Sequence, residues 1–303
     1  MPTNSNSPVD IRQSNLWDEY LHNLGWKSER LNNNCLAYIK NVSFLGSIIK
    51  IPKISSPISF REIDRLAKRT SAFFVKLEPA IEVTNNLASQ TYQQLKASGF
   101  KQDKWALNPT KTFQIDLTKS EEDLLANMEK DTRYNVRLAA RNGISVKETN
   151  NLEAFKKLYY ETASRKGFWV PKKELETLWK IFSEQNSANI LTAFYKGKPL
   201  AATVLLSTDK IGYYYHAASL NTHREVMAPY FLLWQAMRFL KKKGCRVLDL
   251  EGIFDSRIPT TKRWKGFTLF KKGFGGREVE YLGSFTKYYK LWAKILFFPT
   301  RYF

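Results

Sequence analysis

The sequence predicts an α+β fold with mixed sheets, arranged as two successive units of similar secondary structure. Short β-rich runs alternate with amphipathic helical stretches along the 303-residue chain. In the second half, three sequential strands are followed by a helix and a further strand, an order typical of α+β domains. A hydrophobic content of 43% and an aromatic content of 14% favour packed globular structure over disorder.

The first unit is expected to span residues 1–144. From Cys35 the pattern runs through CLAYIK, GSIIKIP, the helical FREIDRLAKR, the β-rich AFFVKLEP, the helical ASQTYQQLKASGF and the strand KTFQIDL. One helix over about Ser120 to Asn142 then links the two units. A serine followed by acidic residues opens this helix, and Gly143 closes it.

The second unit is expected to span residues 145–303. Helices around 152–166 and 172–184 precede the strands ILTAFY, LAATVLLS and GYYYHAAS, which form a meander. Pro229 and Gly244 suit the two ends of the next helix, which is apolar around nearly its whole circumference and should be buried. With the strand RVLDL after it, this order matches the core of GNAT-type acyltransferases. The chain is therefore predicted to be a tandem of GNAT-like domains.

The chain is strongly basic, with 48 Lys and Arg against 28 Asp and Glu and a net charge of +20. Such a field indicates a polyanionic partner: nucleic acid, an anionic membrane surface or a small phosphorylated substrate. Charge alone does not separate these partners. A high isoelectric point that serves only solubility is the alternative.

The linking helix carries a basic stripe, because Lys130, Arg133, Arg137 and Arg141 are spaced to share one face. Either a solvated surface or a phosphate-binding site explains the stripe, and Arg133 and Arg137 are our candidates for substrate binding.

The segment after Asp255 is the most asymmetric in charge, with only Glu278 and Glu280 as acidic residues. Aromatic side chains alternate with its cations, a composition that suits RNA binding but is equally typical of buried aromatics. Its eleven basic residues are Arg257, Lys262, Arg263, Lys265, Lys271, Lys272, Arg277, Lys287, Lys290, Lys294 and Arg301.

The two ends of the chain bear on localisation. The polar start MPTNSNSPVDIRQ lacks the features of a signal peptide, so we expect a cytoplasmic protein. No run reaches the ~18 apolar residues of a membrane-spanning helix. The end, YYKLWAKILFFPTRYF, is either a peripheral membrane-interface anchor or a terminal helix packed on the body of the protein.

Several chemistries are disfavoured by what the sequence contains. Cys35 and Cys245 are expected to be two buried thiols, and the three scattered histidines offer no zinc ligand set, so we predict no metal and no cofactor. The glycines of GFGG, from Gly273 to Gly276, lack the lysine and Ser/Thr ending of a phosphate-binding P-loop. The G-x-S-x-G elbow of hydrolases is also missing.

The stretch KTFQIDLTKSEEDLLANMEKDTRYNVRLAARNGISV resembles the Fem family signature, whose T-R-Y-N-x-R core matches Thr132 to Arg137. Further similar blocks are LYYETASRKGF, YYYHAASLNTHREVMAPYFLLWQAM, GCRVLDLEGIFD and WKGFTLFKKGFGG, which together cover most of residues 111–283. The resemblance implies two GNAT-like units and a peptidyltransferase that moves an amino acid from aminoacyl-tRNA onto a peptidoglycan precursor. The long coiled-coil arm of some relatives is not visible here.

The resemblance also implies roles for individual residues. The F-K-x-x-F element places a catalytic pair on Phe270 and Lys271, whose fixed cation would stabilise the negative charge that develops on the ester carbonyl. Arg165 in the R-K-G-F element is the matched candidate for binding the precursor's phosphate. Tyr214 is favoured over Tyr215 as the strand residue that faces a cleft.

Three further residues are candidates from their position in the sequence. Asp116, at the end of the QIDL strand, is a candidate base for the attacking amine or a structural cap before a helix. Tyr160 and Trp169 flank Arg165 and would bind sugar or peptide unless they pack in the core.

Two other functions remain open at this point. One keeps the fold and uses acyl-CoA as the donor for an envelope polysaccharide or lipid, although no Q/R-x-x-G-x-G/A pyrophosphate loop is visible. The other is a basic RNA-binding module without enzymatic activity.

Overall fold

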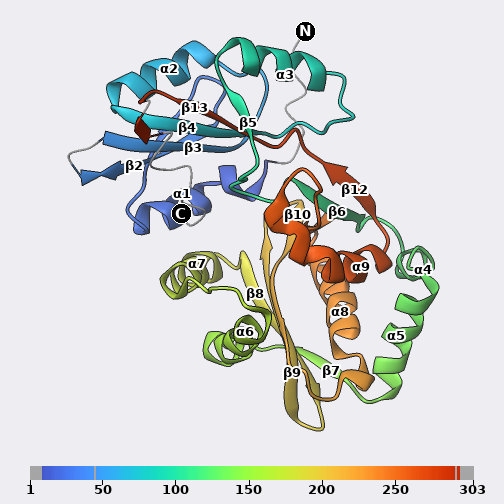
Figure 1. Ribbon diagram of the computed structural model, residues 1–303. Helices are drawn as coiled ribbons and strands as arrows, with labels where there is room; N and C mark the ends of the chain where they lie inside the picture. The colour runs from blue at the N-terminus through green and yellow to red at the C-terminus, as the bar shows by residue number, and fades with distance from the viewer. Residues whose placement is uncertain (1–8, 44–45, 291, 294–303) are drawn as a thin grey trace. The chain divides into compact units, whose positions relative to one another are not determined.

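The computed structural model describes residues 9–43, 46–290 and 292–293 (Figure 1). These residues form two compact units that are interleaved along the chain. The central unit contains residues 112–253 and 265–278, and the amino-terminal unit contains residues 9–111, 254–264 and the described residues from 279 onward. The expected boundary after residue 144 therefore falls inside the central unit, because the strand at 111–116 and the helix at 130–141 both pack against later elements of that unit.

The amino-terminal unit is built on a mixed sheet. In sheet order, its described strands are β1 (Lys27–Arg30), β2 (Leu36–Val42), β3 (Gly46–Ile54), β4 (Ala72–Pro79), β13 (Ser284–Tyr288) and β5 (Lys101–Asp103). Only β3 and β4 run parallel among the strand pairs described. Its helices are η1 (Ile11–Gln13), α1 (Asn15–Asn23), α2 (Phe60–Arg69), α3 (Ala88–Ala97) and η4 (Pro259–Trp264).

The central unit contains the second sheet. In sheet order, its described strands are β12 (Arg277–Glu280), β6 (Lys111–Asp116), β11 (Val247–Gly252), β10 (Ile211–Ser219), β9 (Lys198–Ser207), β8 (Ala188–Tyr195) and β7 (Ser145–Glu148). Its helices are α4 (Glu121–Ala126), α5 (Lys130–Arg141), α6 (Leu152–Lys166), α7 (Lys172–Glu184), η3 (Arg224–Val226), α8 (Ala228–Lys242) and α9 (Lys265–Gly273). The predicted β8–β9–β10 meander and the buried helix α8 are both confirmed.

The parallel pair β10 and β11 separates partway along its length. The two strands are paired from Ile211 with Val247 to Tyr213 with Asp249. Beyond this point β11 continues beside β6, with a shift of register between Asp249 and Gly252. A shift of this kind is a β-bulge, which bends the strand and redirects its side chains. The bulge lies at the carboxyl end of β11.

The linking helix is broken in two, which corrects the single helix expected over residues 120–142. α4 ends at Ala126, and α5 begins at Lys130. The backbone N–H of Glu129, just before α5, donates to the carbonyl of Gly273 at 2.9 Å. Gly275 lies so close to the break that a Cβ there would be 2.7 Å from the carbonyl oxygen of Asn127. The glycines of GFGG therefore allow close backbone packing rather than phosphate binding.

The carboxyl-terminal segment enters the amino-terminal unit as a strand. β13 lies between β4 and β5, and Lys287 on it forms an ion pair with Asp64 of α2 at 2.7 Å. The segment expected to be an interfacial anchor or a packed terminal helix, residues 288–303, begins at the end of this strand and lies mostly outside the described residues. Lys294 and Arg301 of the expected anchor lie outside the described residues. In the part of the chain that is described, no helix is long and apolar enough to cross a bilayer.

Candidate active site

Lys271 is a buried cation in the last turn of α9. The residue is only 9% exposed, and its Nζ donates a hydrogen bond to the carbonyl oxygen of Gly252 at 2.7 Å. The ammonium also lies 4.9 Å from the centre of the Phe267 ring. Burial lowers the pKa of Lys271 to about 8, while the negative charges of Glu251 and Asp249 act in the opposite direction. The side chain is therefore mostly charged at neutral pH.

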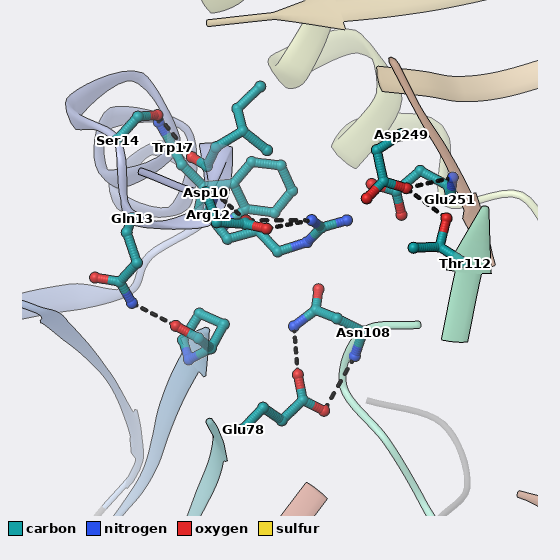
Figure 2. Close-up of polar contacts among 12 residues, drawn as sticks. Asp10, Arg12, Gln13, Ser14, Trp17, Glu78, Asn108, Thr112, Asp249 and Glu251 are labelled. Carbon is teal, nitrogen blue, oxygen red and sulfur yellow. Dashed lines mark hydrogen bonds and ion pairs between the residues drawn. The ribbon is translucent and has the colours of Figure 1, made fainter. Parts of the chain in front are cut away.

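The β11 bulge holds two carboxylates beside this lysine. Asp249, 8% exposed, accepts hydrogen bonds from Thr112 Oγ1 at 2.6 Å, from Gln114 Nε2 at 3.1 Å and from the backbone N–H of Glu251 at 2.7 Å. Figure 2 shows the Thr112 hydroxyl and the Glu251 backbone both directed at the Asp249 carboxylate. Glu251 is 9% exposed and has a left-handed φ of 59°. A buried carboxylate in that conformation is unusual for a strand residue.

Phe270 fastens α9 to α8. Its ring meets Tyr230 edge-on at 5.0 Å and Phe274 at 5.2 Å, within the core of the central unit. Aromatic pairs at these distances and angles are favourable beyond the area that they bury. The two neighbouring residues thus make different contacts: Phe270 packs α9 against α8, and Lys271 extends to the β11 bulge.

Asp116 has a structural role at the other end of β6. Its carboxylate accepts from the Thr118 hydroxyl at 2.6 Å and from the Thr118 backbone N–H at 3.0 Å, and these bonds lower its pKa. It pairs with Val247, whereas Thr112 pairs with Gly252 beside Lys271. Four residues of strand place Asp116 about 13 Å from that position. Asp116 therefore stabilises the turn that follows β6, whereas Ser120 is the N-cap of α4, and the structure does not bring Asp116 to Lys271.

The three tyrosines of β10 do not follow simple alternation. Tyr214, expected to face a cleft, is buried in the core of the central unit, and burial raises its pKa. Tyr215 is only half-buried. The preference for Tyr214 came from the family resemblance, whereas strand alternation required only that the two tyrosines have opposite orientations. A shift of register follows between Tyr214 and His216.

His216, which sequence reasoning left without a role, is half-buried in this region. Its Nδ1 is 3.1 Å from the Tyr159 hydroxyl of α6, and burial lowers its pKa to about 4. The imidazole is therefore neutral at physiological pH and helps to pack α6 on the sheet.

Arg165 and Tyr160 both lie on α6, but about 140° apart around the helix. The Arg165 guanidinium is exposed and donates to the carbonyl of Ser219 at 2.8 Å. The Tyr160 hydroxyl is buried without a hydrogen-bond partner among the described residues, and the Lys172 ammonium lies 5.2 Å from its ring. Trp169 is 78% exposed and so does not pack in the core. Arg165 and Trp169 remain accessible to a ligand.

The two arginines of the α5 stripe differ in their surroundings. Arg133 donates to the carbonyls of Leu125 and Ala126 at 3.2 and 3.0 Å, so its guanidinium caps the carboxyl end of α4. Arg137 is exposed. Arg137 is therefore the more exposed of the two cations, whereas the half-buried Arg133 guanidinium is bonded to the end of α4.

Sequence reasoning missed Asp249 and Glu251. The available signal was a pair of carboxylates at alternate positions of VLDLEG, in a strand that is otherwise apolar. Both cysteines are buried free thiols, as predicted. Among the described residues, no group of three His, Cys, Asp or Glu side chains is placed to hold a metal ion.

A protein-family model described as the FemAB family matches residues 57–193 and 172–296 of this chain. The lipid II:glycine glycyltransferase of Staphylococcus haemolyticus (strain JCSC1435) is 22% identical, over 91% of this chain and 87% of that protein. That of Staphylococcus aureus (strain MRSA252) is 22% identical over 93% and 88%. The first alignment runs over 371 positions, more than the 303 residues here, so that relative contains inserted segments that this chain lacks.

Solved structures show the same fold. The crystal structure of FemX has a TM-score of 0.80 at 18% identity and covers 98% of this chain and 96% of its own. The L-PGS structure from Bacillus licheniformis has a TM-score of 0.57 at 12% identity, over 90% and 87%. A tandem GNAT protein from the clavulanic acid biosynthesis pathway has a TM-score of 0.52 at 10% identity, over 93% and 90%. The predicted α+β fold of tandem GNAT-like type is confirmed.

Proposed function

Because the chain belongs to the FemAB family, we propose that it is an aminoacyltransferase that adds an amino acid to the stem peptide of a peptidoglycan precursor. Its relatives are named for glycine transfer involving lipid II, which supports a lipid-linked muropeptide as the acceptor and cell-wall cross-bridge formation as the process. The donor we propose is aminoacyl-tRNA. The chain's net charge of +20 suits such a polyanion.

The observation that carries this proposal is the buried Lys271 at the β11 bulge. An ammonium group has three N–H donors, and the bond to Gly252 leaves donors for a second acceptor. A cation in a buried site interacts more strongly with a developing negative charge than a cation in water. It is also already in place, so no reorganisation is needed when the charge forms.

In the proposed reaction, the amine of the acceptor attacks the carbonyl carbon of the aminoacyl ester. A C–N bond forms, and the carbonyl oxygen becomes an oxyanion that the Lys271 ammonium stabilises. The intermediate then collapses with cleavage of the ester C–O bond. The ribose oxygen of the tRNA leaves and takes up a proton, which balances the proton that the attacking amine loses.

Two substrate contacts are proposed outside the bulge. Arg165 is exposed at the end of α6 and can bind a phosphate of the precursor, with Trp169 nearby to contact its sugar or peptide. Arg137 on α5 is a candidate for the RNA backbone. Peripheral contact with the cytoplasmic face of the membrane would bring the enzyme to a lipid-linked acceptor.

The proposal is tested by the donor that supports transfer. A radiolabelled amino acid, supplied as aminoacyl-tRNA, is incubated with the protein and a lipid-linked or UDP-linked muropeptide. We expect label in the muropeptide and its loss when the tRNA is first digested with RNase. Transfer from an acyl-CoA instead would favour the acyl-CoA-dependent enzyme, and tRNA binding without transfer would favour the RNA-binding module.

A further inference from the structure

Glu251 combines a strained backbone with a buried charge at the point where β11 meets Lys271. Its φ of 59° lies in the left-handed region, which is unfavourable for an ordinary residue and which glycine adopts freely. Gly252, the next residue, does not have a left-handed φ. The chain thus places a glutamate where the backbone favours glycine, and strain of this kind points to a function of the side chain.

The surroundings explain how the strain is maintained. The Asp249 carboxylate accepts a hydrogen bond from the Glu251 backbone N–H at 2.7 Å. It also accepts hydrogen bonds from the side chains of Thr112 and Gln114 on β6. These bonds fix the bulge between Asp249 and Gly252. The same bulge orients the Gly252 carbonyl, which accepts the Lys271 Nζ at 2.7 Å. The backbone of Glu251 therefore lies between Asp249, which stabilises the bulge, and Gly252, whose carbonyl binds the lysine.

The two carboxylates of the bulge, Asp249 and Glu251, differ in their interactions. The Asp249 carboxylate already receives three hydrogen bonds that pin β6 to β11, which makes it a structural anchor. Of the two carboxylates, Glu251 has the larger effect in raising the pKa of the buried Lys271. Other charged groups lie near α9: Glu129 beside Gly273, and the exposed Lys272.

We propose that Glu251 is a positioning residue, which from its left-handed conformation in the β11 bulge keeps the Lys271 side chain charged and aimed at the reacting ester. This inference rests on the proposed function for the role of Lys271. Burial alone disfavours the ammonium, and a neutral lysine stabilises no oxyanion. The carboxylate of Glu251 offsets part of that effect of burial.

The test uses Glu251→Gln and Glu251→Gly, with two readouts. The first is the pKa of Lys271, followed by NMR in protein labelled with ¹³C at lysine Cε and assigned with Lys271→Arg. We expect both variants to lower this pKa by about one unit or more, because an adjacent opposite charge has been removed. Transfer at pH 8 should then fall about fivefold, with little change at pH 6, since a one-unit shift mainly depletes the charged form near its old pKa.

The second readout is thermal unfolding, which separates a strained functional residue from a structural one. Glu251→Gly should unfold at the same temperature as the wild type or higher, because glycine removes the backbone strain. Lys196→Gly is the matched control: it relieves a left-handed φ of 48° at an exposed turn and should leave the pH profile unchanged.

Two results would overturn the inference. One is an unchanged Lys271 pKa and an unchanged pH profile in Glu251→Gln. The other is a Glu251→Gly protein that unfolds several degrees earlier while Glu251→Gln keeps full transfer, as expected of a purely structural residue. A wild type that transfers no amino acid would instead refute the proposed function, and the NMR titration would still decide the relation between Glu251 and Lys271.

Discussion

Replacing Lys271 by methionine should separate activity from stability, because the folded protein holds this ammonium at a cost. Burial lowers the pKa of Lys271 from 10.5 to about 8. That difference corresponds to about 3 kcal/mol, and it counts against the folded state at every pH below about 8. The unfolded chain binds the proton more tightly, so this destabilisation fades as the pH rises from 8 to 10.5.

Methionine removes the buried charge but leaves the Gly252 carbonyl without its donor, at a cost of about 1–3 kcal/mol. We therefore expect Lys271→Met to be as stable as the wild type at pH 7, or more stable. Loss of one oxyanion donor costs about 2.7–4 kcal/mol of barrier, so turnover should fall at least about a hundredfold. The assays are label transfer from aminoacyl-tRNA and thermal unfolding at pH 7.

A variant that transfers at close to the wild-type rate would refute the role of Lys271. A variant that is inactive only because it unfolds at pH 7 would refute the view that its charge is held at a cost. Lys271→Arg provides the control, because it retains a cation at all relevant pH values.

Other substitutions give sharper expectations than the sequence alone allowed. Asp116→Asn should keep near-normal turnover and lose at most about 1 kcal/mol of stability, because the Asp116 carboxylate only accepts hydrogen bonds from Thr118 in the turn after β6; a hundredfold loss of turnover would support its role as a base. Arg133→Ala should lower the unfolding temperature by removing the cap of α4, whereas Arg137→Ala should leave it unchanged and raise the KM for tRNA at moderate salt. The reverse pattern would contradict the assignment. Truncation after Gly283 should abolish folding of the amino-terminal unit, since it deletes β13 from within the sheet; a folded, monomeric product by circular dichroism and gel filtration would show otherwise.

Much of the fold could be predicted because its signals are local. The β8–β9–β10 meander and the buried α8 follow from runs of apolar residues whose period and length can be read directly from the sequence. The insertion of β13 between β4 and β5 could not, because that pairing joins segments about two hundred residues apart. The break between α4 and α5 was missed for a similar reason: it depends on the close approach of Gly275.

The candidate site divides in the same way. Lys271 and Phe270 were identified from a short motif, and the structure places the lysine in a buried, charged environment. The distance of Asp116 from Lys271 could not be read from the sequence, because it depends on the register of β6 against β11. Tyr214 was favoured over Tyr215 by the resemblance, and the structure buries Tyr214 in the core and leaves Tyr215 half-buried.

The most direct test of the account is the pH dependence of single-turnover transfer from aminoacyl-tRNA to the lipid-linked muropeptide, compared between the wild type and Lys271→Arg. If a charged Lys271 stabilises the oxyanion, the wild-type rate divided by the Lys271→Arg rate should be constant at low pH. This ratio should fall as the pH passes about 8, where the wild-type lysine loses its proton. A ratio that stays constant up to pH 9.5 would contradict the central role of the charged lysine.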